Sequence, residues 1–167
     1  MSVLEQQEVR KKYYTEAMRY IANAKDCLKK TVIDGRMYAD PKYVKMACGT
    51  AYSGVLVALD GFLLLKGIHR PESKKLRKSI EHYQYNIGKF DRKMLSNLVE
   101  VYKILHLSGY YDGVQNVDVI KAGFELAKIL IEKIKPSDAA LNGSSAKKTV
   151  QMRVADKGAT ISNKKKP

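Results

Sequence analysis

Apolar residues recur at steps of three and four along five stretches of the chain, with polar residues between them. The clearest stretch runs from Val117 to Lys135, where charged residues recur in antiphase to the apolar ones. Its apolar positions are Val117, Ile120, Phe124, Ala127, Ile131 and Ile134. No stretch alternates for long like a half-buried strand. The pattern therefore predicts an all-α fold whose helices pack through their apolar faces.

The other four predicted helices cover residues 4–30, 41–65, 71–87 and 91–107. Asp40 can accept the free N–H groups of the second helix, and Pro41 suits its first position. From Met46 onward this helix is nearly all apolar or small, which predicts the central position in the fold. Its internal glycines each lower helix propensity by up to about 1 kcal/mol, which indicates close approach of neighbouring helices. These glycines are Gly49, Gly54 and Gly61.

Turn residues separate the predicted helices. Gly35 marks a turn, and Gly67 and Gly88 end the second and third helices. Gly109 is expected to stop the fourth helix, so that residues 110–113 form a corner before the fifth helix, with Asn116 as its cap. Residues 1–135 are thus predicted to form one helical domain. Residues 136–167, rich in Ser, Ala, Gly, Asn and Lys without sustained periodicity, are predicted to be a disordered basic tail.

The formal net charge of +14 is large for 167 residues. Such a charge attracts polyanions, which include nucleic acid, anionic lipid and acidic protein, although it also fits a solvated surface that aids solubility. The acidic N-terminus does not resemble a signal peptide. The longest apolar window, Val55 to Leu65, is interrupted by Asp60 and is shorter than the about 20 residues that span a bilayer. We therefore expect a cytoplasmic protein without a membrane segment.

Few residue clusters suggest catalysis. The only two cysteines, Cys27 and Cys48, have small and apolar neighbours, which suits buried reduced thiols, and they do not make a zinc site. The chain carries no phosphate-binding Gly-rich loop with its Lys, no His-Glu-x-x-His and no Gly-x-Ser-x-Gly. We predict no metal and no cofactor.

The third predicted helix is the most basic part of the domain. Its cations are Lys74, Lys75, Arg77 and Lys78. Cations at a helix start oppose the helix dipole by about 0.3–1 kcal/mol each. This unfavourable arrangement marks either a binding surface for an anionic partner or neutral variation on a surface helix.

Arg77 is followed by four residues and then His82, a spacing that resembles the RNase members of the HEPN superfamily of small helical bundles. The Tyr- and Ala-bearing first helix, the apolar second helix and the Tyr-Tyr-Asp corner before the last helix are also similar to that family. The resemblance covers roughly residues 10 to 135, and it implies an up-and-down four-helix bundle with one additional short helix, which forms a homodimer. It also implies metal-independent RNA cleavage, with His82 as general acid or base and Arg77 stabilising charge on the phosphate. On one continuous helix the two side chains would point about 140° apart, so convergence requires a helix break or a second chain.

Four further residues have two interpretations each. His106 is either a binding residue or a histidine at a helix end, where the dipole favours its charged form. Tyr110 and Tyr111 either stack on bases or anchor the core. Asp60, in the apolar second helix, needs a Lys, Arg, Tyr or backbone donor as a partner, and we expect a structural pairing, for example with a tyrosine of the first helix, rather than a catalytic acid. His69 lies in a loop and carries no prediction.

The sequence leaves three functions open. The first is a non-catalytic module that binds RNA or an acidic protein through Lys74, Lys75, Lys78, His106, Tyr110 and Tyr111. The second is a metal-independent RNase that uses Arg77 and His82, in a toxin or defence system. The third is a structural homo-oligomeric bundle. We favour the first, because backbone binding by clustered cations requires no catalytic motif.

Overall fold

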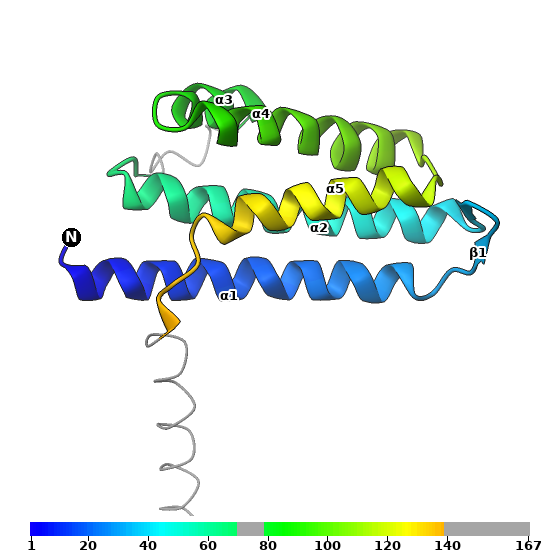
Figure 1. Cartoon of the computed structure of the whole chain (residues 1–167), viewed down its shortest axis with the longest axis horizontal. Coiled ribbons are helices and arrows are strands. Elements are labelled where there is room, and N and C mark those ends of the chain that lie inside the picture. Colours follow the sequence, from blue (N-terminus) through cyan, green and yellow to red (C-terminus); the bar gives the residue numbers. More distant parts are fainter. Residues whose placement is uncertain (70–78, 139–167) are drawn as a thin grey trace, which may run out of the picture.

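The protein is described by a computed structural model that covers residues 1–69 and 79–138. Its elements are α1 (Val3–Leu28), β1 (Ile33–Asp34), β2 (Met37–Tyr38), α2 (Pro41–Leu65), α3 (Ile80–Gly88), α4 (Arg92–Val101), the π-helix η1 (Tyr102–Asp112) and α5 (Val117–Glu132). Figure 1 shows α1 and α2 lying side by side along most of their lengths, with α5 across α2 and the α3, α4 and η1 segments beyond it. The predicted all-α class is confirmed for the described residues.

Polar side chains cap the helices at the expected residues. Asp40 Oδ1 accepts a hydrogen bond from Lys42 N at 2.8 Å. Asn116 Oδ1 accepts from the backbone amides of residues 118 and 119 at 3.0 and 3.1 Å. Asp91 caps α4 in the same way, through Met94 N at 2.8 Å. These bonds satisfy amides that have no partner within the helix, and they fix where each helix begins.

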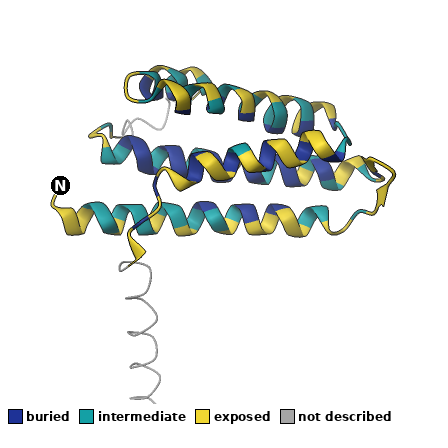
Figure 2. Cartoon of the chain, in the orientation of Figure 1, coloured by how far each residue is buried: buried dark blue, intermediate teal, exposed yellow. Residues whose placement is uncertain are grey.

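α2 is the central helix, as predicted, because it packs against α1, η1 and α5. The buried positions of α2, α4 and α5 meet in one core (Figure 2). The apolar positions named for the fifth predicted helix are all buried: Val117, Ile120, Phe124, Ala127, Ile131 and Ile134. At the same helical spacing in the fourth, Met94, Leu98, Val101 and Leu105 are buried as well. The helical spacing in the sequence thus identified the core face of both segments.

The first two helices approach closely at glycines. A Cβ on Gly54 would lie 2.8 Å from Tyr20 Cβ, and a Cβ on Gly61 would lie 2.6 Å from Tyr13 Cβ. Carbon atoms in contact normally lie about 3.5–4.0 Å apart, so no side chain fits at either position. The predicted reason for glycines in α2 is confirmed.

The third helix begins later than predicted. Ser79 is extended, with φ −86° and ψ 165°, and α3 starts at Ile80 rather than at Pro71. Residues 70–78 lie outside the described residues. A helix cannot run continuously through Ser79, and the helical spacing of residues 71–87 did not reveal this break.

The fourth predicted helix is longer than expected, because Gly109 does not stop it. α4 continues directly into η1, which ends at Asp112 before Gly113, at φ +72°. Gly113 N donates to Ser108 O, five residues back, as in a π-helix. Gly109 is buried inside η1 against Cys48, and a Cβ there would lie 2.7 Å from Cys48 Cβ. The glycine is needed for this close packing and not for a turn.

A short hairpin that the sequence did not predict connects α1 and α2. β1 and β2 pair Ile33 with Tyr38 around the expected turn, where Gly35 has φ +57°. The hairpin then packs against the start of α5, because Tyr38 N donates to Gln115 O at 2.8 Å and Val117 N donates to Arg36 O at 3.0 Å. Strands of two residues are too short to show an alternating pattern.

α2 is the one helix within residues 1–69 and 79–138 that is long and apolar enough to cross a membrane. Half of its most apolar window is buried inside the fold. The core helix of a soluble domain meets the same criterion, so this finding is weak evidence for a membrane segment.

Candidate functional site

One face of α2 stays open between α1 and η1. Its residues recur at steps of three and four, which places them on one side of the helix: Met46, Thr50, Ser53, Val57, Asp60 and Leu64. Two hollows lie along this face, and the three histidines of the chain line them. We call them the Asp60 cavity and the Tyr52 hollow.

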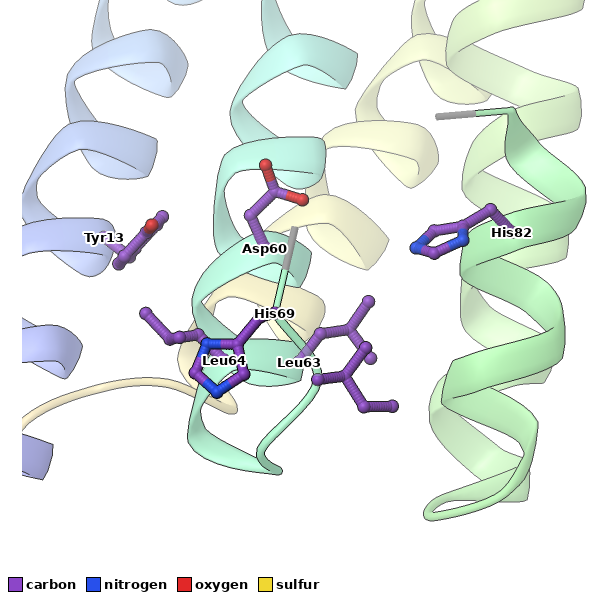
Figure 3. Close-up of a pocket in the computed structure, with 7 residues that line it drawn as sticks. Tyr13, Asp60, Leu63, Leu64, His69 and His82 are labelled. Carbon is purple, nitrogen blue, oxygen red and sulfur yellow. The ribbon is translucent and has the colours of Figure 1, made fainter. Parts of the chain in front are cut away.

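The Asp60 cavity has a volume of about 130 Å³ (Figure 3). It is lined by Tyr13, Asp60, Leu63, Leu64, Ile68, His69 and His82. Figure 3 shows Tyr13, Asp60 and His82 extending toward it from three different helices. The sequence predicted a tyrosine partner for Asp60, but on the first helix; Tyr83 of α3 supplies a hydrogen bond from its hydroxyl to Asp60 Oδ1 at 2.8 Å.

His82, one of the two predicted catalytic residues, is half-buried at this cavity. Asn86 Nδ2 donates to the His82 carbonyl at 2.8 Å and lies 3.5 Å from His82 Nδ1. Arg77 lies outside the described residues, as do Lys74, Lys75 and Lys78. His82 lies in α3, which begins at Ile80 after the extended Ser79, and its pairing with Arg77 stays a prediction.

The residues predicted to bind a partner on η1 come together in an aromatic cluster. His106 is its centre, with ring centroids of Tyr52 at 4.7 Å, Tyr102 at 5.1 Å, Tyr111 at 5.1 Å and Tyr110 at 6.0 Å. The rings of His106 and Tyr110 are nearly parallel, at 16°. Tyr110 and Tyr111 also contact each other edge to face at 5.2 Å. The cluster therefore joins a buried ring of α2 to exposed rings of η1.

The exposure of the two tyrosines contradicts one of their two interpretations, whereas base stacking stays a prediction. Tyr110 is 45% exposed and Tyr111 is 61% exposed. Rings this accessible do not anchor a core, so the core-anchor interpretation is wrong. The sequence missed the rest of the cluster, although the four-residue spacing of Tyr102, His106 and Tyr110 was a signal that they share a helix face.

The Tyr52 hollow lies beside this cluster and has a volume of about 470 Å³. It is lined by Tyr20, Met46, Gly49, Thr50, Tyr52, Ser53, Leu56, His106 and Tyr110. Most of these side chains are apolar or aromatic, and a few carry hydroxyl or imidazole groups. Such a composition is typical of sites for small organic groups.

Tyr52 lines the hollow and carries a hydroxyl group. The residue is 7% exposed, and within the described part of the chain its Oη has no hydrogen-bond partner. No fully enclosed side-chain oxygen or nitrogen in that part lacks a partner. Tyr52 Oη is therefore accessible, and the hollow is the opening that Tyr52 lines.

Burial also sets the protonation of the cluster. Desolvation lowers the pKa of His106 below its usual value, so the imidazole is neutral at pH 7. The predicted helix-end effect would have raised this pKa, but the helix continues past His106 to Asp112. Burial raises the pKa of Tyr52, and the neighbouring Tyr102 and Glu81 raise it further. Tyr52 is therefore a phenol that can donate a hydrogen bond.

Two cations lie beside the aromatic rings. The Arg19 guanidinium is 5.5 Å from the centroid of the Tyr20 ring and pairs with Glu16 on the surface. Lys45 Nζ donates to the carbonyl of Tyr111 at 3.0 Å. Neither side chain lines the hollow itself, but each lies next to one tyrosine near it.

Most of the net positive charge comes from residues outside the described ranges. Residues 1–69 and 79–138 carry 19 basic and 15 acidic side chains, a net charge of +4. Residues 70–78 and 139–167 carry twelve basic and two acidic side chains. Among the described residues, no group of three or more His, Cys, Asp or Glu side chains is arranged to hold a metal ion.

Comparisons with known proteins address the family and not the function. A solved structure, a protein of unknown function from Dyadobacter fermentans, is 42% identical, with a TM-score of 0.66. The match covers 74% of this chain and 94% of that one. No curated protein matches. A family described as "Domain of unknown function (DUF5618)" matches residues 12–136. Because this match spans more than half of the sequence, the chain belongs to the DUF5618 family.

Proposed function

We propose that this protein is a non-catalytic module that binds single-stranded RNA, with the exposed rings of Tyr110 and Tyr111 as its base-stacking surface. Aromatic side chains recognise single strands by stacking on unpaired bases, and each stacked base contributes about 1–3 kcal/mol. The observation that carries the proposal is the packing of both exposed rings against His106. This packing holds the rings in place before a base arrives, which reduces the entropy lost on binding.

Charge supports the same function. Lys45 lies beside Tyr111 and Arg19 beside Tyr20, and the sequence adds the cations of residues 70–78 and 139–167. Phosphate contacts by such cations are independent of base sequence and weaken as salt rises. We propose that the rings rest on an HEPN-like up-and-down four-helix bundle, in which α3 is the additional short helix.

The test measures the affinity for a labelled, mixed-sequence RNA of about 12 nucleotides, within the usual site sizes, by fluorescence anisotropy at several salt concentrations. Tyr111→Ala removes one stacking ring and should weaken binding by about 5- to 150-fold. Tyr85→Ala is the matched control, because Tyr85 is 70% exposed on α3 and has no contact with the cluster. It should bind RNA like the parent.

Four results would contradict this proposal. Absence of RNA binding at low salt would refute it, as would equal affinities of Tyr111→Ala and the parent. If polyglutamate displaces RNA, and Tyr111→Ala loses as much affinity for polyglutamate as for RNA, an acidic protein partner would be favoured instead. RNA cleavage that resists chelators and disappears in His82→Ala would replace the non-catalytic function with the RNase alternative.

A further inference from the structure

We propose that the Tyr52 hollow is a pocket for one nucleobase, whose edge is read by Tyr52 and His106. This inference rests on the proposed RNA binding and names the group that RNA would place at the site. The remainder of the strand would lie across Tyr110 and Tyr111 outside the pocket.

The size and walls of the hollow suit a planar ring. Its volume of about 470 Å³ falls within the range of small-molecule sites. Tyr20 lines it from α1 and Tyr110 from η1, so that aromatic rings stand on opposite sides of the open face of α2. Met46 and Leu56 add apolar surface along α2. A base that enters would stack on aromatic faces and leave water.

Gly49 is needed for this arrangement. A Cβ at this position would lie 2.9 Å from Tyr110 Cδ2. The Tyr110 ring therefore lies directly on the backbone of α2, where it forms one wall of the hollow. The sequence contained the glycine but gave no sign of its partner, which is 61 positions away.

The η1 rings form one stack beside the hollow. Tyr102, His106 and Tyr110 are four residues apart along η1, with interplanar angles of 28° and 16° between successive rings. His106 and Tyr110 of this stack line the hollow.

The polar groups of the hollow match the edge of a base. Within residues 1–69 and 79–138, the hydroxyls of Tyr52 and Thr50 have no hydrogen-bond partner, whereas Ser53 Oγ donates to Gly49 O at 2.9 Å. The neutral His106 carries one donor and one acceptor nitrogen. Bases present donors and acceptors side by side, and a neutral pocket favours a base over a charged phosphate.

The test separates the pocket from the RNA surface by using free nucleosides as well as RNA. Adenosine and cytidine are titrated into protein with labelled aromatic carbons, and NMR shifts are followed for His106 and the tyrosines. We expect shifts confined to Tyr20, Tyr52, His106 and Tyr110. Tyr52→Phe keeps the ring and removes the hydroxyl, so nucleoside and RNA affinity should each fall about threefold to tenfold.

Two further variants make the result independent of folding defects. Thr50→Phe adds a bulky side chain on the open face of α2, should fill the hollow, and should abolish nucleoside binding. Tyr85→Phe, on α3, is the control for removal of a tyrosine hydroxyl and should bind nucleosides like the parent. The melting temperatures of Thr50→Phe, Tyr85→Phe and Tyr52→Phe should all match that of the parent.

The two proposals fail in different ways. If RNA binds and Tyr111→Ala weakens it, but nucleosides cause no shifts and Tyr52→Phe binds RNA normally, the pocket is refuted and RNA binding stands. If nucleosides shift the named resonances and Tyr52→Phe lowers the nucleoside affinity, but RNA does not bind, the pocket stands and the RNA function is refuted. Shifts that persist in Thr50→Phe overturn the assignment of the hollow.

Discussion

Substitution of Gly61 by alanine tests the close approach of α1 and α2, which forms one wall of both hollows. The added Cβ would lie 2.6 Å from Tyr13 Cβ and 2.7 Å from Tyr13 Cγ. A new χ1 rotamer could move Cγ away, but it cannot move Cβ, because the position of Cβ is fixed by the backbone. The two helices would have to separate locally by about 1 Å to restore an ordinary carbon contact.

Two effects of known size oppose each other. Overpacking of a well-packed interface costs about 1–3 kcal/mol. Replacing glycine by alanine inside a helix returns up to about 1 kcal/mol of helix propensity. We therefore expect a net loss of about 1 kcal/mol in the free energy of unfolding, which would lower the melting temperature by about 2–4 °C.

Gly49→Ala is the matched control, because it makes the same change in the same helix. Its Cβ would meet only ring atoms of Tyr110, at 2.9 Å or more, and the exposed ring can rotate away. The helix-propensity gain is common to both variants, so their difference isolates the clash with α1, at about 1–3 kcal/mol.

Urea unfolding gives the free energies of unfolding of both variants and the parent, and equal m-values would show that the variants change stability alone. Gly54→Ala should behave like Gly61→Ala, since its Cβ would lie 2.8 Å from Tyr20 Cβ. The reasoning is refuted if Gly61→Ala is as stable as Gly49→Ala, or more stable than the parent.

Two further predictions concern groups outside the hollows. Asp91→Ala should lower the free energy of unfolding by about 1–2 kcal/mol, since Asp91 caps α4 and its Oδ2 lies 2.7 Å from Lys133 Nζ, whereas Asp91→Asn should keep most of the cap. The contact with Lys133, and after it the hydrogen bond from the Met94 amide, lowers the pKa of Asp91. The free energy of unfolding of the parent should therefore exceed that of Asp91→Asn above pH about 3.9, and this difference should be lost as the pH falls through the folded pKa. An equal difference in acid would contradict this. For the thiols, Cys48 is fully buried and burial raises its pKa to about 12, so in the folded protein only the half-buried Cys27 should react readily with a chromogenic disulfide reagent. Two rapidly reacting thiols without denaturant would show that the packing around Cys48 is wrong.

The sequence predicted those parts of the fold that depend on neighbouring residues. The apolar spacing identified the buried faces of α4 and α5, and Asp40 and Asn116 were recognised as helix caps. Both signals are local, because a helix places residues three and four apart on one face and a cap bonds amides within its own first turn.

The features that the sequence did not predict depend on distant contacts. Gly109 looked like a helix stop, but it is a close contact with Cys48 inside a continuing helix. Tyr52 and His106 lie 54 positions apart, and no spacing rule joins them. The histidine was noted for its place near a helix end, whereas its environment and lowered pKa come from the rings around it. A single sequence does not specify which apolar residue of one helix meets which residue of another.

The composition of α2 leads to a stronger argument for a binding face than any single residue does. A helix that is apolar on all sides is expected to be buried on all sides. Yet only half of the most apolar window of α2 is buried, and Met46, on its open face, is 44% exposed. Leu56 and Val57 beside it are half-buried, so this face keeps apolar surface that a partner could cover. The accessible hydroxyl of Tyr52 and the neutral imidazole of His106 lie at this same face. A second copy that covered the face through apolar contacts alone would leave these polar groups without partners, whereas a base would satisfy them.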